Sequence, residues 1–168
     1  MGYKLDFKNL ECCIVDDEPF IQRIVKSILT SLGVRDIRMA GDGAGGYKLL
    51  KRKPADLIFI DWTMKPISGI DLVKKIRSSD DQNIADIPII MLTAHSEREY
   101  VEQAVQAGAN DYLVKPVSPK LLRQRIEGIF KNRLPLSEET RRTKPKPLKA
   151  KPEETEEDDF FEISVKEE

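Results

Sequence analysis

The chain has 168 residues, enough for one well-packed domain, and 40% of its side chains are hydrophobic and 34% charged. Its 28 basic and 29 acidic side chains nearly cancel, so the composition gives no sign of a basic surface for nucleic acid. No apolar run reaches the length of a membrane span, and the first residues lack the apolar core of a signal peptide. Cys12 and Cys13 are neighbours in an apolar run, which is typical of small core residues and not of a disulfide framework. We therefore expect a cytoplasmic protein that binds neither nucleic acid nor membranes.

Short apolar segments that predict strands alternate with amphipathic segments that have helical spacing, for example from Phe20 to Leu32 before a helix stop at Gly33. The expected strands are residues 12–16, 36–40, 57–61, 87–92 and 111–114. The first, third and fourth are apolar without alternation, as in strands that are buried on both faces. Because parallel strands need right-handed crossovers, this order predicts helices on both faces of one sheet. The predicted fold class is α/β, a doubly wound five-stranded parallel sheet of flavodoxin-like order 2-1-3-4-5.

The character of the sequence changes near residue 132. Residues 132–168 contain four prolines and only two aromatic residues, too little apolar surface to offset the entropy of ordering, so a disordered tail is predicted. Charge in this segment is divided, because residues 132–151 carry seven basic against two acidic side chains and residues 152–168 carry nine acidic against one basic. The expected organisation is an N-terminal extension over residues 1–9, one domain over 10–131 and a charged tail over 132–168.

Large apolar residues interrupt the acidic part of this tail. Phe160, Phe161 and Ile163 lie in the run Glu156-Glu157-Asp158-Asp159-Phe160-Phe161-Glu162-Ile163. One interpretation is solvated disorder without a role. The other is a short docking motif that becomes ordered on a basic partner, with the three apolar residues as anchors. The basic stretch 141–151 could also fold back on the acids, but exposed ion pairs of that kind are weak.

Three carboxylates come at the ends of two of the expected strands. Asp16 and Asp17 end the first strand and Asp61 ends the third. In the expected strand order these strands are neighbours at the switch point, where ligands bind beyond the carboxyl ends. Clustered carboxylates raise each other's pKa, and a hard divalent cation relieves the repulsion. We therefore expect Mg²⁺ here, with Mn²⁺ as the alternative ion, whereas the simpler interpretation is a set of solvated loop acids.

Two further residues come at strand ends on the same edge of the sheet. Thr93 follows the fourth strand and Lys115 follows the fifth. A hydroxyl can bond one phosphoryl oxygen and an ammonium can neutralise another, and electrostatics and positioning supply most of the catalysis in phosphoryl transfer. Each residue alone is typical of an ordinary surface position, but five residues from the ends of four strands converge here.

Together, these strand-end residues and their neighbours resemble the motifs of a known family. Residues 10–131 resemble response-regulator receiver domains of the single-domain chemotaxis type, which belong to two-component signalling systems. The residues that carry the resemblance are Val15-Asp16-Asp17-Glu18-Pro19, Asp61 with Met64 and Gly69, Thr93-Ala94, Gly108-Ala109, and Tyr112 with Lys115-Pro116.

The resemblance implies that Asp61 accepts a phosphoryl group from a histidine kinase or a histidine phosphotransfer protein. It implies Asp17, Asp61 and the backbone carbonyl of Thr63 as direct metal ligands, with Asp16 holding the metal through water. Such a domain is not an enzyme for a separate substrate, because it catalyses only its own phosphorylation and dephosphorylation.

The resemblance also implies that Thr93 and Lys115 contact the phosphate. Thr93 and Tyr112 would switch the surface for a downstream protein that the sequence does not identify. A cis peptide bond between Lys115 and Pro116 is a further implication.

One departure from the family pattern lies beside the acceptor. The family usually has proline four residues after the acceptor aspartate, where this chain has Lys65, and Pro66 follows. The spacing to Gly69 is kept, so the loop has the same length but a different surface.

Two alternative functions compete with this interpretation. Gly41, Gly43 and Gly46 match the G-x-G-x-x-G pattern of a dinucleotide-binding module, and Asp61 stands where the ribose-binding acid would be. The simpler explanation of these glycines is that they form a turn before a helix. Asp61 could alternatively be the nucleophile of a phosphatase of the haloacid-dehalogenase type, but those enzymes need an acid two residues later, where this chain has Thr63.

Overall fold

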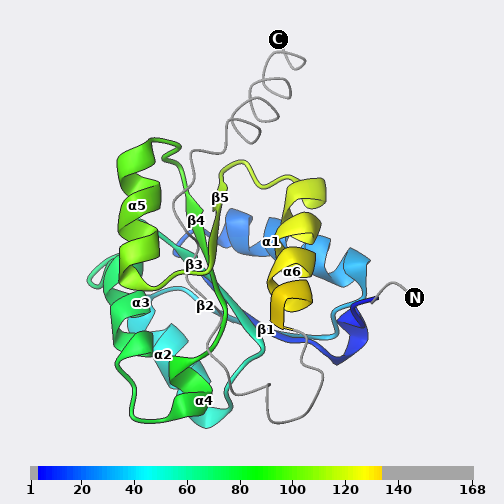
Figure 1. The fold of residues 1–168 in the computed structure, drawn as a ribbon, viewed down its shortest axis with the longest axis horizontal. Coiled ribbons are helices and arrows are strands. Elements are labelled where there is room, and N and C mark those ends of the chain that lie inside the picture. Colours follow the sequence, from blue (N-terminus) through cyan, green and yellow to red (C-terminus); the bar gives the residue numbers. More distant parts are fainter. Residues whose placement is uncertain (1–3, 134–168) are drawn as a thin grey trace.

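The computed structural model describes residues 4–133, which form a five-stranded parallel sheet with helices on both faces (Figure 1). The strands are β1 (Glu11–Val15), β2 (Asp36–Ala40), β3 (Leu57–Asp61), β4 (Ile89–Thr93) and β5 (Asp111–Val114). They are arranged in the order β2-β1-β3-β4-β5, and all neighbouring pairs are parallel. The predicted fold class and strand order are therefore confirmed.

Helices connect these strands, as predicted. They are α1 (Pro19–Leu32), α2 (Gly43–Arg52), α3 (Gly69–Arg77), α4 (Gln82–Ala85), α5 (Arg98–Ala107) and α6 (Pro119–Arg133), with a 3-10 turn η1 (Phe7–Asn9) before β1. The short helix α4 and the turn η1 were not predicted. Among the described residues, no helix is long and apolar enough to cross a membrane. The predicted disordered tail begins at residue 132, but residues 132 and 133 belong to α6. The rest of the predicted tail, residues 134–168 with the acidic docking motif, lies outside the described residues.

The boundaries of two strands differ from the prediction. β1 includes Glu11 and ends before Asp16, and β4 begins at Ile89 instead of residue 87. Pro88 has no N–H for the ladder, although its carbonyl accepts a hydrogen bond from the Ile58 N–H at 3.0 Å. Thr93 belongs to β4 and pairs with Val114 of β5.

Alternate side chains of the central strands pack on opposite faces of the sheet, as the twofold period of a strand requires. One core lies under α1 and α6 and contains Ile14, Phe59 and Leu92. The other lies under α2, α3, α4 and α5 and contains Val15 and Ile60. Figure 1 shows α1 and α6 on one side of the sheet and α2, α3 and α5 on the other. Burial on both faces explains why these strands are continuously apolar.

Part of the segment expected to be an N-terminal extension packs against the domain. Phe7 and Leu10 are buried in the core under α1 and α6, and Leu5 is packed against it. Asp6 caps the turn η1, because its side chain accepts a hydrogen bond from the Lys8 N–H at 3.1 Å. This segment therefore closes the end of the core where α1 and α6 meet.

Candidate functional site

Four carboxylates gather at the carboxyl edge of the sheet, at the switch point between β1 and β3. Asp16 follows β1 and is fully buried, whereas Asp17 and Glu18 are exposed at the start of the loop to α1. Asp61, the last residue of β3, is only 3% exposed. One carboxylate oxygen from each of these four residues lies within 4.8 Å of the others. The expected convergence of Asp16, Asp17 and Asp61 is confirmed, and Glu18 joins them.

Backbone and side-chain hydrogen bonds hold the first loop in this arrangement. Oδ1 of Asp16 accepts a hydrogen bond from the Glu18 N–H at 2.8 Å. Gln22, on the first turns of α1, donates from Nε2 to the carbonyls of Asp16 at 2.7 Å and Ala40 at 3.0 Å. Gln22 therefore ties the ends of β1 and β2 to α1. No local pattern in the sequence indicates a role for this glutamine, because its two partners lie at the ends of different strands.

Lys115 is the cation of the cluster. Its Nζ lies 3.0 Å from Oδ1 of Asp61, 3.2 Å from Oδ2 of Asp16 and 3.3 Å from Oε1 of Glu18. Its backbone N–H donates to the carbonyl of Thr93 at 2.7 Å, which fixes the loop after β5 against the end of β4. The side chain is only 13% exposed, so little water surrounds the contacts between this ammonium and the carboxylates.

Burial controls the electrostatics of the site. The pKa of Asp61 is raised to about 7, mainly by burial and also by the charge of Asp16, against the hydrogen bond from Lys115. Burial also raises the pKa of Asp16, again against the influence of Lys115. For Lys115, burial lowers the pKa, but the hydrogen bond and charge of Asp61 outweigh it, so the pKa is raised overall. One ammonium is therefore shared among several carboxylates and leaves negative charge in excess.

The donor set fits a hard divalent cation. All four clustered side chains offer oxygen, which suits Mg²⁺ or Mn²⁺ better than Zn²⁺, an ion that prefers nitrogen and sulfur. Within residues 4–133, no donor makes a hydrogen bond to the buried Oδ2 of Asp16, although Lys115 lies near it. This oxygen can still accept a ligand, and it lies beside three other carboxylates. A cation bound there would reduce the repulsion among the four negative charges.

The remaining predicted residues lie at the same edge of the sheet or close to it. Thr93 is 2% exposed at the end of β4, and its Oγ1 accepts a hydrogen bond from the His95 N–H at 2.9 Å. Thr63 is exposed in the loop after β3. Tyr112 is half-buried on β5, and the guanidinium carbon of Arg125 lies 5.9 Å from its ring centroid. The Lys115–Pro116 peptide bond is cis, as the resemblance implied, and the Lys65–Pro66 bond is cis as well.

Gly69 brings the loop after β3 back to the acceptor strand. Its N–H donates to the carbonyl of Trp62 at 2.9 Å. A Cβ atom at this position would clash with the carbonyl oxygen of Asp61 and would meet the Trp62 Cα at 2.9 Å. The backbone approaches so closely that only glycine fits. The glycine that the resemblance singled out therefore has a steric reason at this site.

An aromatic stack covers the loops beside the site. Tyr100, on the first turn of α5, stacks on His95 with parallel rings whose centroids are 4.0 Å apart. Its edge also packs against Trp62, with ring centroids 5.3 Å apart. This stack joins the residue after Asp61 to the loop after Thr93. Tyr100 could not be predicted from the sequence, because no local pattern links it to the acceptor strand.

The glycines of the dinucleotide-type pattern lie at a turn and the start of a helix, and one of them, Gly46, has a packing role. They lie after β2, the edge strand, and not at the switch point between β1 and β3. A Cβ atom on Gly46 would meet Val15 Cγ2 at 2.6 Å, so this glycine lets α2 approach β1. Asp42 caps α2 by accepting a hydrogen bond from the Gly45 N–H at 2.6 Å. The turn-and-helix explanation of this pattern is the better one.

Comparison with known proteins gives one consistent result. A family model described as the response regulator receiver domain matches residues 12–127. The chain is similar to chemotaxis protein CheY-3 of Vibrio cholerae, with 39% identity over 123 residues that cover 73% of this chain and 93% of the relative. The fold is similar to that of Vibrio cholerae CheY4, with a TM-score of 0.65, 27% identity, and coverage of 71% of this chain and 97% of that one. It is also similar to the receiver domain of the sensor histidine kinase PA1611 from Pseudomonas aeruginosa, which was solved with a magnesium ion in its active-site cleft. That match has a TM-score of 0.64 and 31% identity, and covers 71% of this chain and 95% of the other.

The fold and the carboxylate edge are those of a signalling module of two-component systems. The chain belongs to the response regulator receiver domain family, and its curated relatives include chemotaxis proteins of the CheY type.

Proposed function

We propose that Asp61 is the phosphoacceptor of this receiver domain. The observation that supports this most directly is the contact between Asp61 and Lys115, a buried carboxylate and an ammonium 3.0 Å apart at the carboxyl edge of the sheet. A nucleophile needs neighbours that stabilise the charge on the incoming group, and such neighbours act most strongly where water is excluded. Asp61 combines burial, a cation and a second carboxylate, whereas Asp17 and Glu18 are exposed.

The proposed reaction transfers a phosphoryl group from a phosphohistidine. A carboxylate oxygen of Asp61 forms a bond to phosphorus while the P–N bond breaks, and the departing imidazole takes up a proton. Lys115 neutralises charge on the phosphoryl oxygens. Thr93 donates its hydroxyl hydrogen to one of them, which is compatible with the acceptor role of its oxygen toward the His95 N–H. Hydrolysis of the acyl phosphate by water returns Asp61 to its free form.

We further propose that the carboxylate edge holds Mg²⁺ during this reaction. Asp17, Asp61 and the backbone carbonyl of Thr63 would be direct ligands, and Asp16 would act through water. The ion would supply positive charge between the carboxylates and the phosphoryl oxygens. The donor set supports this assignment, and the PA1611 receiver domain was solved with a magnesium ion coordinated in its active-site cleft.

A surface for the phosphodonor lies beside the site. Phe20, in the first turn of α1, is 64% exposed, which is unusual for a large apolar side chain. It borders a groove of about 310 Å³ whose apolar lining also includes Ile24, Val117 and Pro119. α1 begins three residues after Asp16, so a helix that presents a phosphohistidine toward Asp61 would meet this groove. We assign the groove to the histidine kinase or the histidine phosphotransfer protein.

Phosphorylation would then change a second surface for a downstream protein. Thr93 would move toward the phosphate, and Tyr112 would turn inward into the vacated space. Tyr112 is half-buried and lies on β5 beside β4, so it is placed to respond to a change at Thr93. A switch of this kind needs only a few kcal/mol of differential stabilisation. The readout surface would consist of α5, β5 and the first turns of α6.

Intact-mass analysis with acetyl phosphate and Mg²⁺ tests the acceptor assignment. The wild-type chain should gain one phosphoryl group, and Asp61→Asn should gain none. Asp71→Asn, which changes an exposed acid on the first turn of α3, should behave as wild type. An adduct of equal yield on Asp61→Asn would disprove the assignment.

A further inference from the structure

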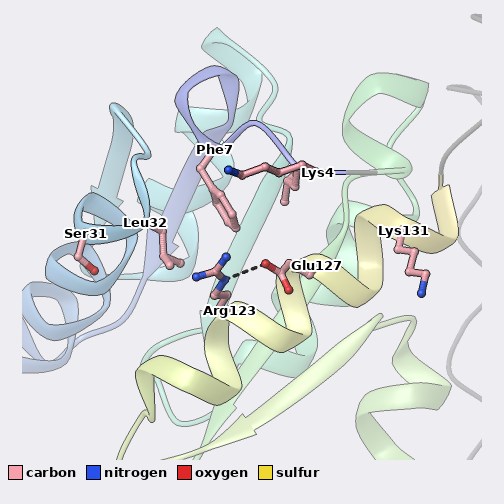
Figure 2. A pocket seen from close by; sticks show the side chains of 8 residues that line it. Lys4, Phe7, Ser31, Leu32, Arg123, Glu127 and Lys131 are labelled. Carbon is pink, nitrogen blue, oxygen red and sulfur yellow. Dashed lines mark hydrogen bonds and ion pairs between the residues drawn. The ribbon is translucent and has the colours of Figure 1, made fainter. Parts of the chain in front are cut away.

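A second groove lies on the face of the molecule where α1, α6 and the N-terminal segment meet. It has a volume of about 570 Å³, and Leu5, Phe7 and Leu32 supply its apolar lining. Figure 2 shows Phe7 pointing into the space between α1 and α6. Phe7 and Leu32 also contact the domain core from here, so this apolar lining is held by packing. The groove takes no part in the carboxylate site.

Cations surround this apolar lining. Lys4 comes from the N-terminal segment, and Arg123 and Lys131 come from α6. Glu127 is the acidic member of the lining, and its Oε1 accepts a hydrogen bond from Arg123 at 2.8 Å (Figure 2). Three cations against one carboxylate leave the groove with a net positive charge. A fitting occupant therefore carries both apolar side chains and negative charge.

We propose that residues 156–163 of this same chain bind in the α1/α6 groove. Five of these eight residues are acidic, and the other three are Phe160, Phe161 and Ile163. The aromatic side chains match the apolar lining, and the acids match the cations at its edge. No other segment of the sequence combines large apolar residues with an acidic run of this density.

The connection between the groove and this segment has a suitable length. Residues 134–155 lie between the last described residue of α6 and the acidic segment, which makes 22 connecting residues. A flexible chain of that length has a root-mean-square span of roughly 24–29 Å. From Arg133, the groove extends back along α6 as far as Arg123, about 15 Å at the rise of an α-helix. The connecting segment can therefore span the distance, and its shortness gives a high effective concentration.

Paramagnetic relaxation enhancement in the full chain tests this inference. A nitroxide attached through Ser164→Cys labels a single position, because Cys12 and Cys13 are fully buried and burial raises the pKa of their thiols to about 12 and about 11. Amide signals of residues 4–7, 31–32 and 123–131 should lose more intensity than those of α2 and α3. The loss should weaken at high salt, because exposed charges are then screened.

A matched variant separates binding from mere tethering. The same labelled chain with Phe160→Ala and Phe161→Ala keeps its length and charge, and we expect the intensity loss at the groove to be at least halved. On the groove side, Lys4→Glu with Lys131→Glu should have a similar effect, whereas Lys48→Glu on α2 should have none. Equal broadening with and without the phenylalanines would overturn the inference.

A mixing experiment distinguishes binding within one chain from binding between chains. ¹⁵N-labelled protein without a nitroxide is mixed with nitroxide-labelled protein of natural isotope abundance. Broadening in this mixture is compared with broadening in the chain that carries both the ¹⁵N and the nitroxide. The inference predicts almost no broadening in the mixture. Broadening of equal size would show that the segment binds a second copy, and this would overturn the proposal.

Discussion

The Nζ atom of Lys115 lies 3.0 Å from Oδ1 of Asp61, although the two residues are separated by 54 positions in the sequence. The same ammonium also lies within 3.3 Å of carboxylate oxygens of Asp16 and Glu18. A single cation therefore compensates the carboxylates that meet at the ends of β1 and β3. This relationship leads to expectations for both phosphorylation and stability.

Removal of the Lys115 ammonium should slow phosphorylation of Asp61. We expect Lys115→Met to lower the rate with acetyl phosphate by about 10²–10³, the usual effect of losing one group that stabilises a developing anion. An intact-mass time course gives the rate, with Lys48→Met on α2 as a control for an exposed lysine. A rate within twofold of wild type would argue against contact between Lys115 and the phosphate.

The acceptor carboxylate should reduce the stability of the metal-free fold. Burial raises the pKa of Asp61 from 3.8 to about 7, so the folded protein binds an extra proton between these pH values. Stability should therefore fall as the pH rises from about 4 to about 7, by at most about 4 kcal/mol. We expect Asp61→Asn to be more stable than wild type at pH 8 in the presence of a chelator.

The gain from Asp61→Asn should shrink at pH 4, because the wild-type carboxyl is then protonated in the folded state and the pH is close to its unfolded pKa of 3.8. Thermal unfolding of both proteins at the two pH values measures the effect. The loss of the Asp61 interaction with Lys115 works in the opposite direction and limits the gain. A gain that does not depend on pH would mean that ionisation of Asp61 is not its cause.

Affinity for Mg²⁺ should depend more on Asp17 than on Asp16. Oδ1 of Asp16 already accepts a hydrogen bond from the Glu18 N–H, and its Oδ2 faces Lys115. Both contacts favour an indirect role for Asp16, in which a water molecule lies between its carboxylate and the ion. We expect Asp17→Asn to weaken Mg²⁺ binding more strongly than Asp16→Asn. For Asp16→Asn we expect a loss of affinity of about tenfold, which is typical of an indirect ligand. Trp62 fluorescence should report the titration, because Trp62 adjoins Asp61 and is the only tryptophan. Equal affinities for Asp17→Asn and wild type would contradict the assignment.

Gly69 should tolerate no side chain. A methyl group there meets the Asp61 carbonyl and the Trp62 backbone, so Gly69→Ala should cost about 1–3 kcal/mol of unfolding free energy and slow phosphorylation. Gly128→Ala on α6 is the matched control. A Cβ there has nothing within 4 Å, and alanine should stabilise the helix by about 0.5–1 kcal/mol. Denaturant unfolding measures both values, and equal stability of Gly69→Ala and wild type would show that the loop can move away.

The exposed phenylalanine on α1 should matter for a protein donor and not for a small one. We expect Phe20→Ala to slow transfer from a histidine-phosphorylated kinase fragment at least tenfold while the rate with acetyl phosphate stays the same. Met39→Ala on β2, the other exposed large apolar residue of residues 4–133, is the control. If both donors are slowed equally, Phe20 acts on the acceptor site itself and the docking assignment fails.

Much of the site could be predicted because its residues stand at strand ends. The apolar runs before Asp61 and Thr93 identify strands that are buried on both faces, and strand order then brings their ends together. The start of β4 was less clear, because Ile87 is as apolar as the strand itself. There Pro88 decides the boundary, since it cannot donate to the ladder.

Other features depend on approach between distant segments and leave no local pattern. Gln22 joins carbonyls at the ends of β1 and β2, and Tyr100 joins loops that follow β3 and β4. Glu18 lies beside the predicted acids, but its contact with Lys115 follows from the course of the loop before α1. The burial of Phe7 likewise requires that α1 and α6 leave a space for it.

The sequence by itself determined the alternation of strands and helices, the buried character of the central strands and the residues that end them. These properties follow from the periods of local side-chain burial, which a single segment records. Only the tertiary structure decided which carboxylate oxygens share the Lys115 ammonium and why Gly69 is required. It also decided that Leu5 and Phe7 form a groove with α1 and α6. Such relationships arise from the packing of elements that are far apart in the chain. The sequence of one segment does not identify the segment against which it will pack.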